Sequence, residues 1–241
     1  MRAVEVLPGV WHIEESYRDH CTLVCGTDRA VLWDTGQGAG DLRGFVAERT
    51  AAPLTVCLSH GHDDHTCGRA AFARPLIHPA DRWMLAAQDA RRGGAAQEVG
   101  DLLPGQRWDL GGGRHVAVVD LAGHTRGSVG LLLEEDRLLL AGDALGPTLL
   151  MLGAECAPLD ALRQTLERTL TLPCDRFLAS HSPRPLPKEL AAVHLRHLDR
   201  LHTEPPSHPG PYGPDLRRSE RKEHGLRSVL YIHRSLLAGS T

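Results

Sequence analysis

The residues best suited to do chemistry lie in one short segment, SHGHDDH, which covers positions 59 to 65. The segment directly follows Leu54–Ser59, a continuous apolar run of the kind that forms a buried strand. Imidazole nitrogens and carboxylate oxygens are the usual ligands of catalytic zinc. Four such donors within six residues cannot all reach one ion without strain. We therefore expect His60 and His62 to share one ion, and Asp64 and His65 to turn toward a second.

Three more potential ligands occur farther along the chain, each at the end of a predicted strand. His124 lies in AGHTRGS, Asp143 ends the segment LAGD, and His181 ends the segment ASH. A single histidine after a strand is more often a structural residue than a ligand. Together with the first segment, however, these donors predict one site built from loops at the ends of strands.

Composition excludes several other classes of protein. The chain has 241 residues, of which 41% are hydrophobic and 24% charged, and its net charge of −3 gives no basic surface for nucleic acid. No apolar stretch is long enough to cross a membrane. The first residues, MRAVEVLPGVWHIEE, show no secretory signal, so we expect a cytoplasmic protein with free thiols at its six cysteines. The sequence leaves the oligomeric state open.

The pattern of apolar residues predicts alternating strands and helices. The expected strands are Val10–Glu15, Cys21–Gly26, Ala30–Asp34, Leu54–Ser59, Leu76–His78, Arg107–Leu110, Arg114–Leu121, Ser128–Glu134, Arg137–Ala141 and Asp175–Ser180. The expected helices are Asp41–Thr50, Pro79–Gln88, Leu159–Leu172, Pro187–His202 and Asp215–Leu237, the last broken near Gly225. This order predicts an α+β fold, a four-layered αββα sandwich. We expect it to span residues 1–185, with residues 186–241 forming a helical extension packed on the same domain.

These motifs resemble the metallo-β-lactamase superfamily from about Val10 to His181. The resemblance rests on AVLWDTG around Asp34, SHGHDDH, AGHTRGS, LAGD and the final histidine. It implies the metallo-β-lactamase fold and two divalent metal ions, zinc above all, although iron or manganese would also fit. In the family, one ion is bound by the residues that match His60, His62 and His124. The other is bound by those that match Asp64, His65 and His181, while the match to Asp143 bridges the two.

The resemblance also implies a reaction. Two metal ions would activate a hydroxide that attacks an ester, thioester, lactone or amide-like bond in a small molecule. Asp64 is both a ligand and the expected acceptor of the nucleophile's proton, and Asp34 is expected to orient a ligand histidine. The stretch ALGPTLLMLGAEC after Asp143 is apolar, where glutathione-dependent relatives carry a polar, arginine-containing stretch.

Two questions stay open at the level of sequence. Persulfide dioxygenases keep the same histidine motif but use a single iron, so an oxidoreductase is the alternative function. The proline-rich segment Thr203–Pro214 either forms part of the substrate entrance or only connects two C-terminal helices.

Overall fold

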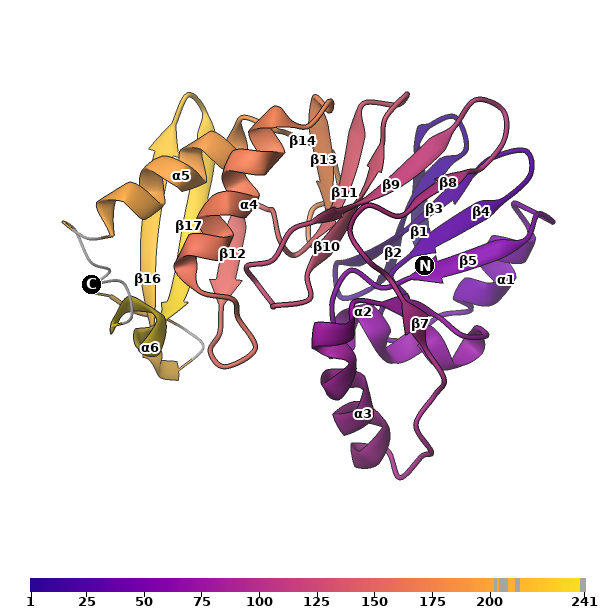
Figure 1. The fold of residues 1–241 in the computed structure, drawn as a ribbon, viewed down its shortest axis with the longest axis horizontal. Coiled ribbons are helices and arrows are strands. Elements are labelled where there is room, and N and C mark those ends of the chain that lie inside the picture. Colours follow the sequence, from indigo (N-terminus) through magenta and orange to yellow (C-terminus); the bar gives the residue numbers. More distant parts are fainter. Residues whose placement is uncertain (202, 204–207, 211–212, 239–241) are drawn as a thin grey trace.

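Three β-sheets and the helices that cover them make up the fold (Figure 1). The computed structural model describes residues 1–201, 203, 208–210 and 213–238. The first sheet has seven strands that follow one another in chain order. They are β1 (Arg2–Leu7), β2 (Val10–Ser16), β3 (Asp19–Cys25), β4 (Ala30–Trp33), β5 (Leu54–Cys57), β6 (Leu76–Ile77) and β7 (Gly100–Asp101).

The second sheet has six strands in the order β14-β13-β11-β10-β9-β8. Strands β9, β10 and β11 are antiparallel, whereas β11 and β13 run parallel. The strands of this sheet are β8 (Arg107–Asp109), β9 (His115–Asp120), β10 (Val129–Leu133), β11 (Leu138–Gly142), β13 (Arg176–Ala179) and β14 (Leu186–Pro187).

The two sheets pack face to face around a shared apolar core. Trp33 and Val31 of the first sheet belong to the same buried cluster as Leu131 and Leu140 of the second. Every residue of β10 and β11 is buried, because the second sheet is covered on both faces. This explains why these strands appear in the sequence as continuous apolar runs without alternation.

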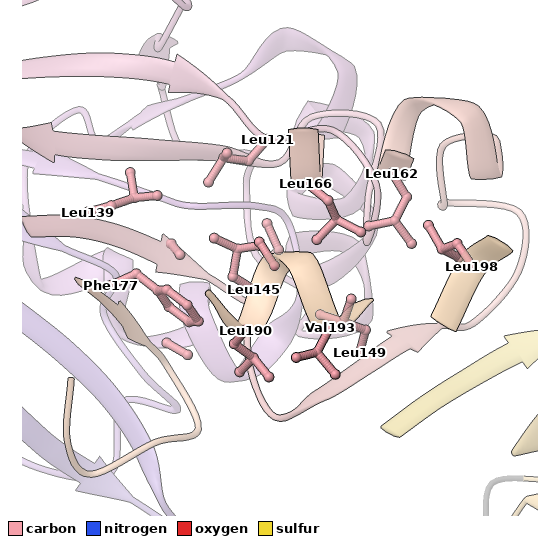
Figure 2. Packing of buried hydrophobic residues seen from close by; sticks show 14 of the residues in the cluster. Leu121, Leu139, Leu145, Leu149, Leu162, Leu166, Phe177, Leu190, Val193 and Leu198 are labelled. Carbon is pink, nitrogen blue, oxygen red and sulfur yellow. The ribbon is translucent and has the colours of Figure 1, made fainter. Parts of the chain in front are cut away.

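Helices cover the outer faces of both sheets. On the first sheet, α1 (Leu42–Ala47) and α3 (Arg82–Arg91) contribute Leu42 and Leu85 to a core shared with the strands. On the second sheet, α4 (Leu159–Thr171) and α5 (Leu190–Arg200) pack over Phe177 (Figure 2). The predicted αββα sandwich is therefore confirmed. No helix in the described ranges is long and apolar enough to span a lipid bilayer.

The prediction of a helix over Asp215–Leu237 is wrong. That region forms the hairpin β16 (Gly213–Glu223) and β17 (Leu226–His233), followed by the short helix α6 (Arg234–Ala238). Gly225, expected to interrupt a helix, forms the hairpin turn with a φ of 76°. Arginine, glutamate and lysine in β16 favour a helix locally, but packing of the apolar face of β17 against α5 overrides that propensity.

This hairpin belongs to a third sheet that the sequence did not predict. Its order is β12-β17-β16-β15, where β12 is Thr148–Met151 and β15 is His208–Gly210. Strand β12 comes from the apolar stretch that follows Asp143, and it pairs in parallel with β17. Most of the segment Thr203–Pro214 lies outside the described residues, so its suggested place at the substrate entrance stays a prediction.

A chain of buried polar side chains joins α5 to the third sheet. His194 contacts the carbonyl oxygen of Gly146 through Nε2 at 2.7 Å and Ser228 Oγ through Nδ1 at 2.7 Å. His197 contacts Ser228 Oγ at 3.0 Å and Ser219 Oγ at 2.6 Å. Burial lowers the pKa of both histidines to about 4. Both side chains are therefore neutral near pH 7.

This network predicts that acid weakens the C-terminal part of the fold. A histidine in the unfolded chain has a pKa of about 6.5, so between pH 6.5 and 4 the unfolded state binds more protons than the folded state. The stabilising contribution is complete above about pH 6.5 and falls as the pH drops toward 4, by at most about 3 kcal/mol per histidine. Urea unfolding from pH 7.5 to 4, compared between the wild type and His194→Gln, measures this slope. The difference in stability between the two proteins should shrink as the pH falls; a constant difference would contradict the assignment.

Candidate metal centre

The predicted ligands lie where the carboxyl ends of strands from both sheets meet. His60 follows β5, His124 follows β9, Asp143 directly follows β11, and His181 follows β13. Two backbone hydrogen bonds join neighbouring segments at this edge: His20 N to Ser180 O at 2.9 Å, and Val129 N to Ser59 O at 3.0 Å. The strand ends thus bring together residues more than a hundred positions apart in the sequence.

Three histidines form the first group of donors. His60 Nε2 lies 2.9 Å from His62 Nδ1, and His124 Nε2 lies 2.9 Å from the same atom. The donor atoms of this group all lie within 4.8 Å of one another, a spacing at which one ion could contact all three. The structure thus brings His124 to the two histidines of the SHGHDDH segment.

Two carboxylates and two histidines form the second group. His181 Nε2 lies 3.1 Å from Asp143 Oδ2 and 3.4 Å from Asp64 Oδ2. His65 Nε2 lies 3.5 Å from Asp143 Oδ1 and 3.6 Å from Asp64 Oδ2. Asp143 also approaches the first group, since its Oδ2 atom is 3.8 Å from His124 Nε2. Asp143 therefore lies between the two groups.

The histidine nitrogens that face the site are free to bind a cation. His124 Nδ1 donates to the carbonyl oxygen of Leu150 at 2.6 Å, and His65 Nδ1 donates to the Asp34 carboxylate at 2.9 Å. Each Nδ1 therefore carries the proton, and in the neutral ring the opposite Nε2 carries a lone pair. His65 Nε2 is fully buried and has no hydrogen-bond partner in the described part of the chain. A buried acceptor without a partner fits a bound metal ion.

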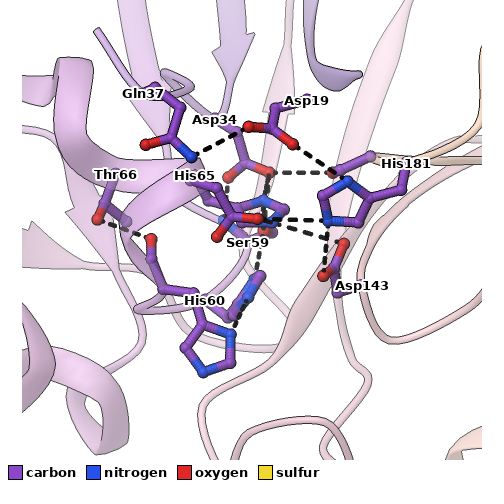
Figure 3. Close-up of polar contacts among 12 residues, drawn as sticks. Asp19, Asp34, Gln37, Ser59, His60, His65, Thr66, Asp143 and His181 are labelled. Atoms are coloured by element: carbon purple, nitrogen blue, oxygen red, sulfur yellow. Dashed lines mark hydrogen bonds and ion pairs between the residues drawn. The ribbon is translucent and has the colours of Figure 1, made fainter. Parts of the chain in front are cut away.

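Asp34 holds predicted ligands of both groups in place (Figure 3). Its Oδ2 atom accepts the His65 Nδ1 proton and also the hydroxyl proton of Ser59, at 2.8 Å. Because Ser59 donates its hydroxyl proton to Asp34, its oxygen can only accept, and it accepts from His60 Nδ1 at 2.9 Å. His60 Nε2 therefore carries the lone pair that faces the other two histidines of the first group. Asp34 itself adopts a φ of 62°, a left-handed conformation that aspartate tolerates better than most residues. The sequence pointed to Asp34 but not to Ser59.

The charge states of His60, His62, Asp64 and Asp143 agree with this arrangement. Burial lowers the pKa of His60 well below its ordinary value and that of His62 to about 4, so both rings are neutral near pH 7. Burial opposes ionisation of Asp64, but a hydrogen bond from His181 outweighs it and brings the pKa of Asp64 to about 2. The pKa of Asp143 is likewise well below its usual range, because His65 and His181 outweigh burial. Neutral imidazoles and ionised carboxylates are the forms that bind metals. The neighbouring carboxylates outweigh burial and raise the pKa of His65 and His181 above its ordinary value, so a metal ion that binds there would displace a proton from each ring.

Sequence reasoning missed Asp19, which orients the last of the predicted ligands, His181. Its Oδ1 atom lies 3.2 Å from His181 Nδ1, and its Oδ2 atom accepts from Gln37 Nε2 at 3.1 Å. The carboxylate is almost completely buried. It therefore directs His181 Nε2 toward Asp143 (Figure 3), and the same nitrogen also lies near Asp64. No motif in the sequence marks Asp19, because its partner His181 lies far away in the sequence, after the last predicted strand.

Asp81 connects the loops that carry the two histidine motifs. Its carboxylate accepts hydrogen bonds from the backbone of Gly61 at 3.1 Å and of Gly127 at 2.9 Å, and from Thr125 Oγ1 at 2.6 Å. Burial raises the pKa of Asp81 above its ordinary value, although these three donors partly offset the effect. The carboxylate thereby holds the loop of His60 and His62 against the loop of His124.

We predict that Asp81→Ala separates these two loops. Three donors lose their acceptor, two of them backbone groups in the buried loops, so we expect a loss of about 2–4 kcal/mol in the free energy of unfolding. Metal affinity should fall as well, because His124 is no longer held beside His62. Urea unfolding and metal titration check both effects. Asp89→Ala, which removes a carboxylate from the other end of α3, is the control for general destabilisation; equal metal affinity in all three proteins would contradict the role of Asp81.

A cavity of about 560 Å³ opens onto both groups of donors. Asp64, Asp143, His124 and His181 line one side. The apolar part of the lining comes from Leu145, Pro147 and Leu150, in the segment that runs into and through β12, and from Ala179 at the end of β13. The volume lies within the range of ordinary small-molecule sites.

Comparison with known proteins agrees with this site. The family model described as Metallo-beta-lactamase superfamily matches residues 19–181, which include all seven predicted ligands. The chain belongs to this superfamily. Solved structures show the same fold: a metallo-beta-lactamase from Pontibacter korlensis has a TM-score of 0.64 at 20% identity, over 82% of this chain and 98% of that one. A family protein from Thermus thermophilus has a TM-score of 0.62 at 20% identity, over 95% of this chain and all of that one.

Curated superfamily members include hydrolases. An acyl-coenzyme A thioesterase from Bos taurus is 29% identical over 178 residues, which are 57% of this chain and 63% of that protein. A hydroxyacylglutathione hydrolase from Rhizobium meliloti is 33% identical over 136 residues, 53% of this chain and 48% of that protein. An uncharacterized protein from Mycobacterium bovis is 39% identical over 123 residues, 43% of this chain and 54% of that protein. The chain thus spans between about half and just under two thirds of these relatives.

Proposed function

We propose that this superfamily member is a hydrolase that depends on two divalent metal ions and cleaves an acyl thioester or ester of a small molecule. The observation that carries the proposal is the position of Asp143 between two converging groups of donors. A carboxylate placed there can contact two cations and offset their mutual repulsion. One group of three histidines and one group of two carboxylates and two histidines match the nitrogen and oxygen ligands that zinc prefers. Iron and manganese accept the same ligands.

The chain's own residues prepare the site for hydrolysis. His60, His62 and His124 would hold one cation, and Asp64, His65 and His181 the other, with Asp143 shared. Bound cations of this kind lower the pKa of water and polarise a carbonyl oxygen. The Asp64 side chain is 29% exposed and lines the cavity, so it can accept a proton from water there. The low pKa of Asp64 keeps it ionised for that task.

The cavity favours substrates with an apolar acyl group. Its apolar lining at Pro147 and Leu150, which are accessible, offers a surface for a hydrocarbon chain beside the donors. Two relatives are named for the hydrolysis of acyl-coenzyme A and of hydroxyacylglutathione, both of which are acylated thiols. We therefore place thioesters first, ahead of lactones, amides and simple esters.

Metal content and a substrate panel test this function together. The protein is stripped of metal, reloaded with zinc, manganese or iron, and assayed on thioester, lactone, phosphodiester and β-lactam substrates. We expect two metal equivalents per chain and hydrolysis of thioesters faster than of the other classes. One iron per chain with oxygen-dependent turnover of a persulfide would instead establish the oxidoreductase alternative.

A further inference from the structure

The turn between β2 and β3 has an unfavourable backbone for its sequence. Ser16 pairs with Asp19, so the turn consists of two residues only, Tyr17 and Arg18. Both have positive φ values, 46° and 72°. Hairpin turns of this kind strongly favour asparagine and glycine, because bulky side chains are strained there. Tyrosine and arginine at these two positions therefore suggest that the turn has a role besides reversing the chain.

Buried histidines tie this turn to the metal centre. The carbonyl oxygen of Arg18 accepts from His20 Nδ1 at 2.9 Å. The ring of His20 stacks on His12, with 4.4 Å between centroids and an interplanar angle of 8°. His12 Nε2 in turn contacts the carbonyl oxygen of Ser182, directly after the predicted ligand His181, at 2.8 Å. The strained turn thus has a fixed position relative to the site.

Both side chains of the turn line the 560 Å³ cavity that holds the donors. Tyr17 is 90% exposed, so the turn forms the outer rim of the cavity, whereas Leu145 and Ala179 of the wall are buried. Arg18 supplies the permanent positive charge among the lining residues, and its guanidinium has no ion pair within the described ranges. A cation at the rim and an apolar wall inside define an amphipathic binding site.

We propose that Arg18 binds an anionic group, a carboxylate or a phosphate, on the part of the substrate that leaves after hydrolysis. This inference rests on the proposed function and narrows it to acyl thioesters or esters of anionic carriers. The acyl chain lies along the apolar wall at Pro147 and Leu150, the scissile bond faces Asp64 and Asp143, and the carrier leaves the cavity beside Arg18. A guanidinium suits this task because it pairs with carboxylate and phosphate oxygens through two hydrogen bonds.

Matched thioesters test the charge preference. The same butanoyl group is offered on N-acetylcysteamine, which is neutral, on 3-mercaptopropionate, which carries a carboxylate, and on 4′-phosphopantetheine, which carries a phosphate. We expect Arg18→Ala to raise KM about tenfold for one or both anionic thioesters and to leave kcat and the neutral substrate within about twofold. Arg18→Lys should recover part of the loss. Arg29→Ala removes another exposed arginine, in the turn at the opposite end of β3, and should change nothing. Equal effects of Arg18→Ala on all three thioesters would overturn the proposal.

A second variant separates recognition from folding. Tyr17→Asn combined with Arg18→Gly installs the residues that this turn favours, so it should raise the melting temperature while abolishing the preference for anionic thioesters. Calorimetric binding of the uncleavable thioether analogues supplies a readout independent of hydrolysis. Binding that depends on Arg18 without any hydrolysis would refute the proposed function alone. Hydrolysis of all three thioesters with no dependence on Arg18 would refute only the role of the rim.

Discussion

Asp143→Ala is expected to remove nearly all hydrolysis and at least one metal ion. Asp143 Oδ2 lies 3.1 Å from His181 Nε2 and 3.8 Å from His124 Nε2, so its loss takes a negative charge from between the two groups. Two cations would then repel each other without a shared carboxylate. Loss of metal assistance removes several kcal/mol of transition-state stabilisation, so we expect turnover to fall by at least about a thousandfold. Steady-state kinetics and elemental analysis of the purified protein measure the two effects.

Two further variants separate the effect of the lost charge from the effect of removing any aspartate. Asp143→Asn keeps the shape of the side chain but removes its charge, and we expect nearly the same loss. Asp175→Ala removes an exposed aspartate just before the start of β13, where it pairs with Arg137 on the surface, and should leave turnover and metal content intact. Wild-type turnover and full metal content in Asp143→Ala would disprove the bridging role.

Asp34→Asn is expected to reduce metal binding while leaving the fold largely intact. Asparagine tolerates the left-handed backbone at this position, and its oxygen can still accept from the backbone N–H of Ser59, now 2.7 Å from Asp34 Oδ1. Its amide nitrogen, however, then faces Ser59 Oγ and His65 Nδ1 and can only donate to them. His65 would be driven to the tautomer with a proton on Nε2, the atom that faces Asp64 and Asp143.

A proton on that nitrogen blocks coordination of a metal. We expect affinity at the second group to fall about 10- to 100-fold, the usual effect of losing the partner of a ligand histidine. Ser59→Ala is the matched comparison, because it removes the contact to His60 and leaves the bond between Asp34 and His65. Competitive metal titration should therefore show the larger loss at the first group for Ser59→Ala and at the second for Asp34→Asn. Identical titrations in both variants would show that Asp34 does not set the tautomer of His65.

Local pattern was sufficient to predict the elements of the sandwich. Helical spacing of leucines predicted α4, a continuous apolar run predicted β5, and a hairpin pattern around Glu135 and Asp136 predicted β10 and β11. It failed for β16, where seven charged side chains along GPDLRRSERKE carry no strand pattern. There the deciding interactions are the pairing with β17, which follows in the same hairpin, and the packing of that hairpin against α5, which comes earlier in the chain.

The spacing of histidines and aspartates was enough to predict seven metal ligands, and the structure brings their donor atoms together in two groups. How these side chains are held depends on contacts that form only in the folded chain. Asp19, Ser59 and Asp81 carry no motif, and each acts on a ligand or loop contributed by another segment. Arg18 likewise could not be singled out from the sequence, because only the folded chain places it at the rim of the cavity. Ligand chemistry is a property of residue type, whereas orientation, tautomer and access depend on contacts between distant parts of the chain.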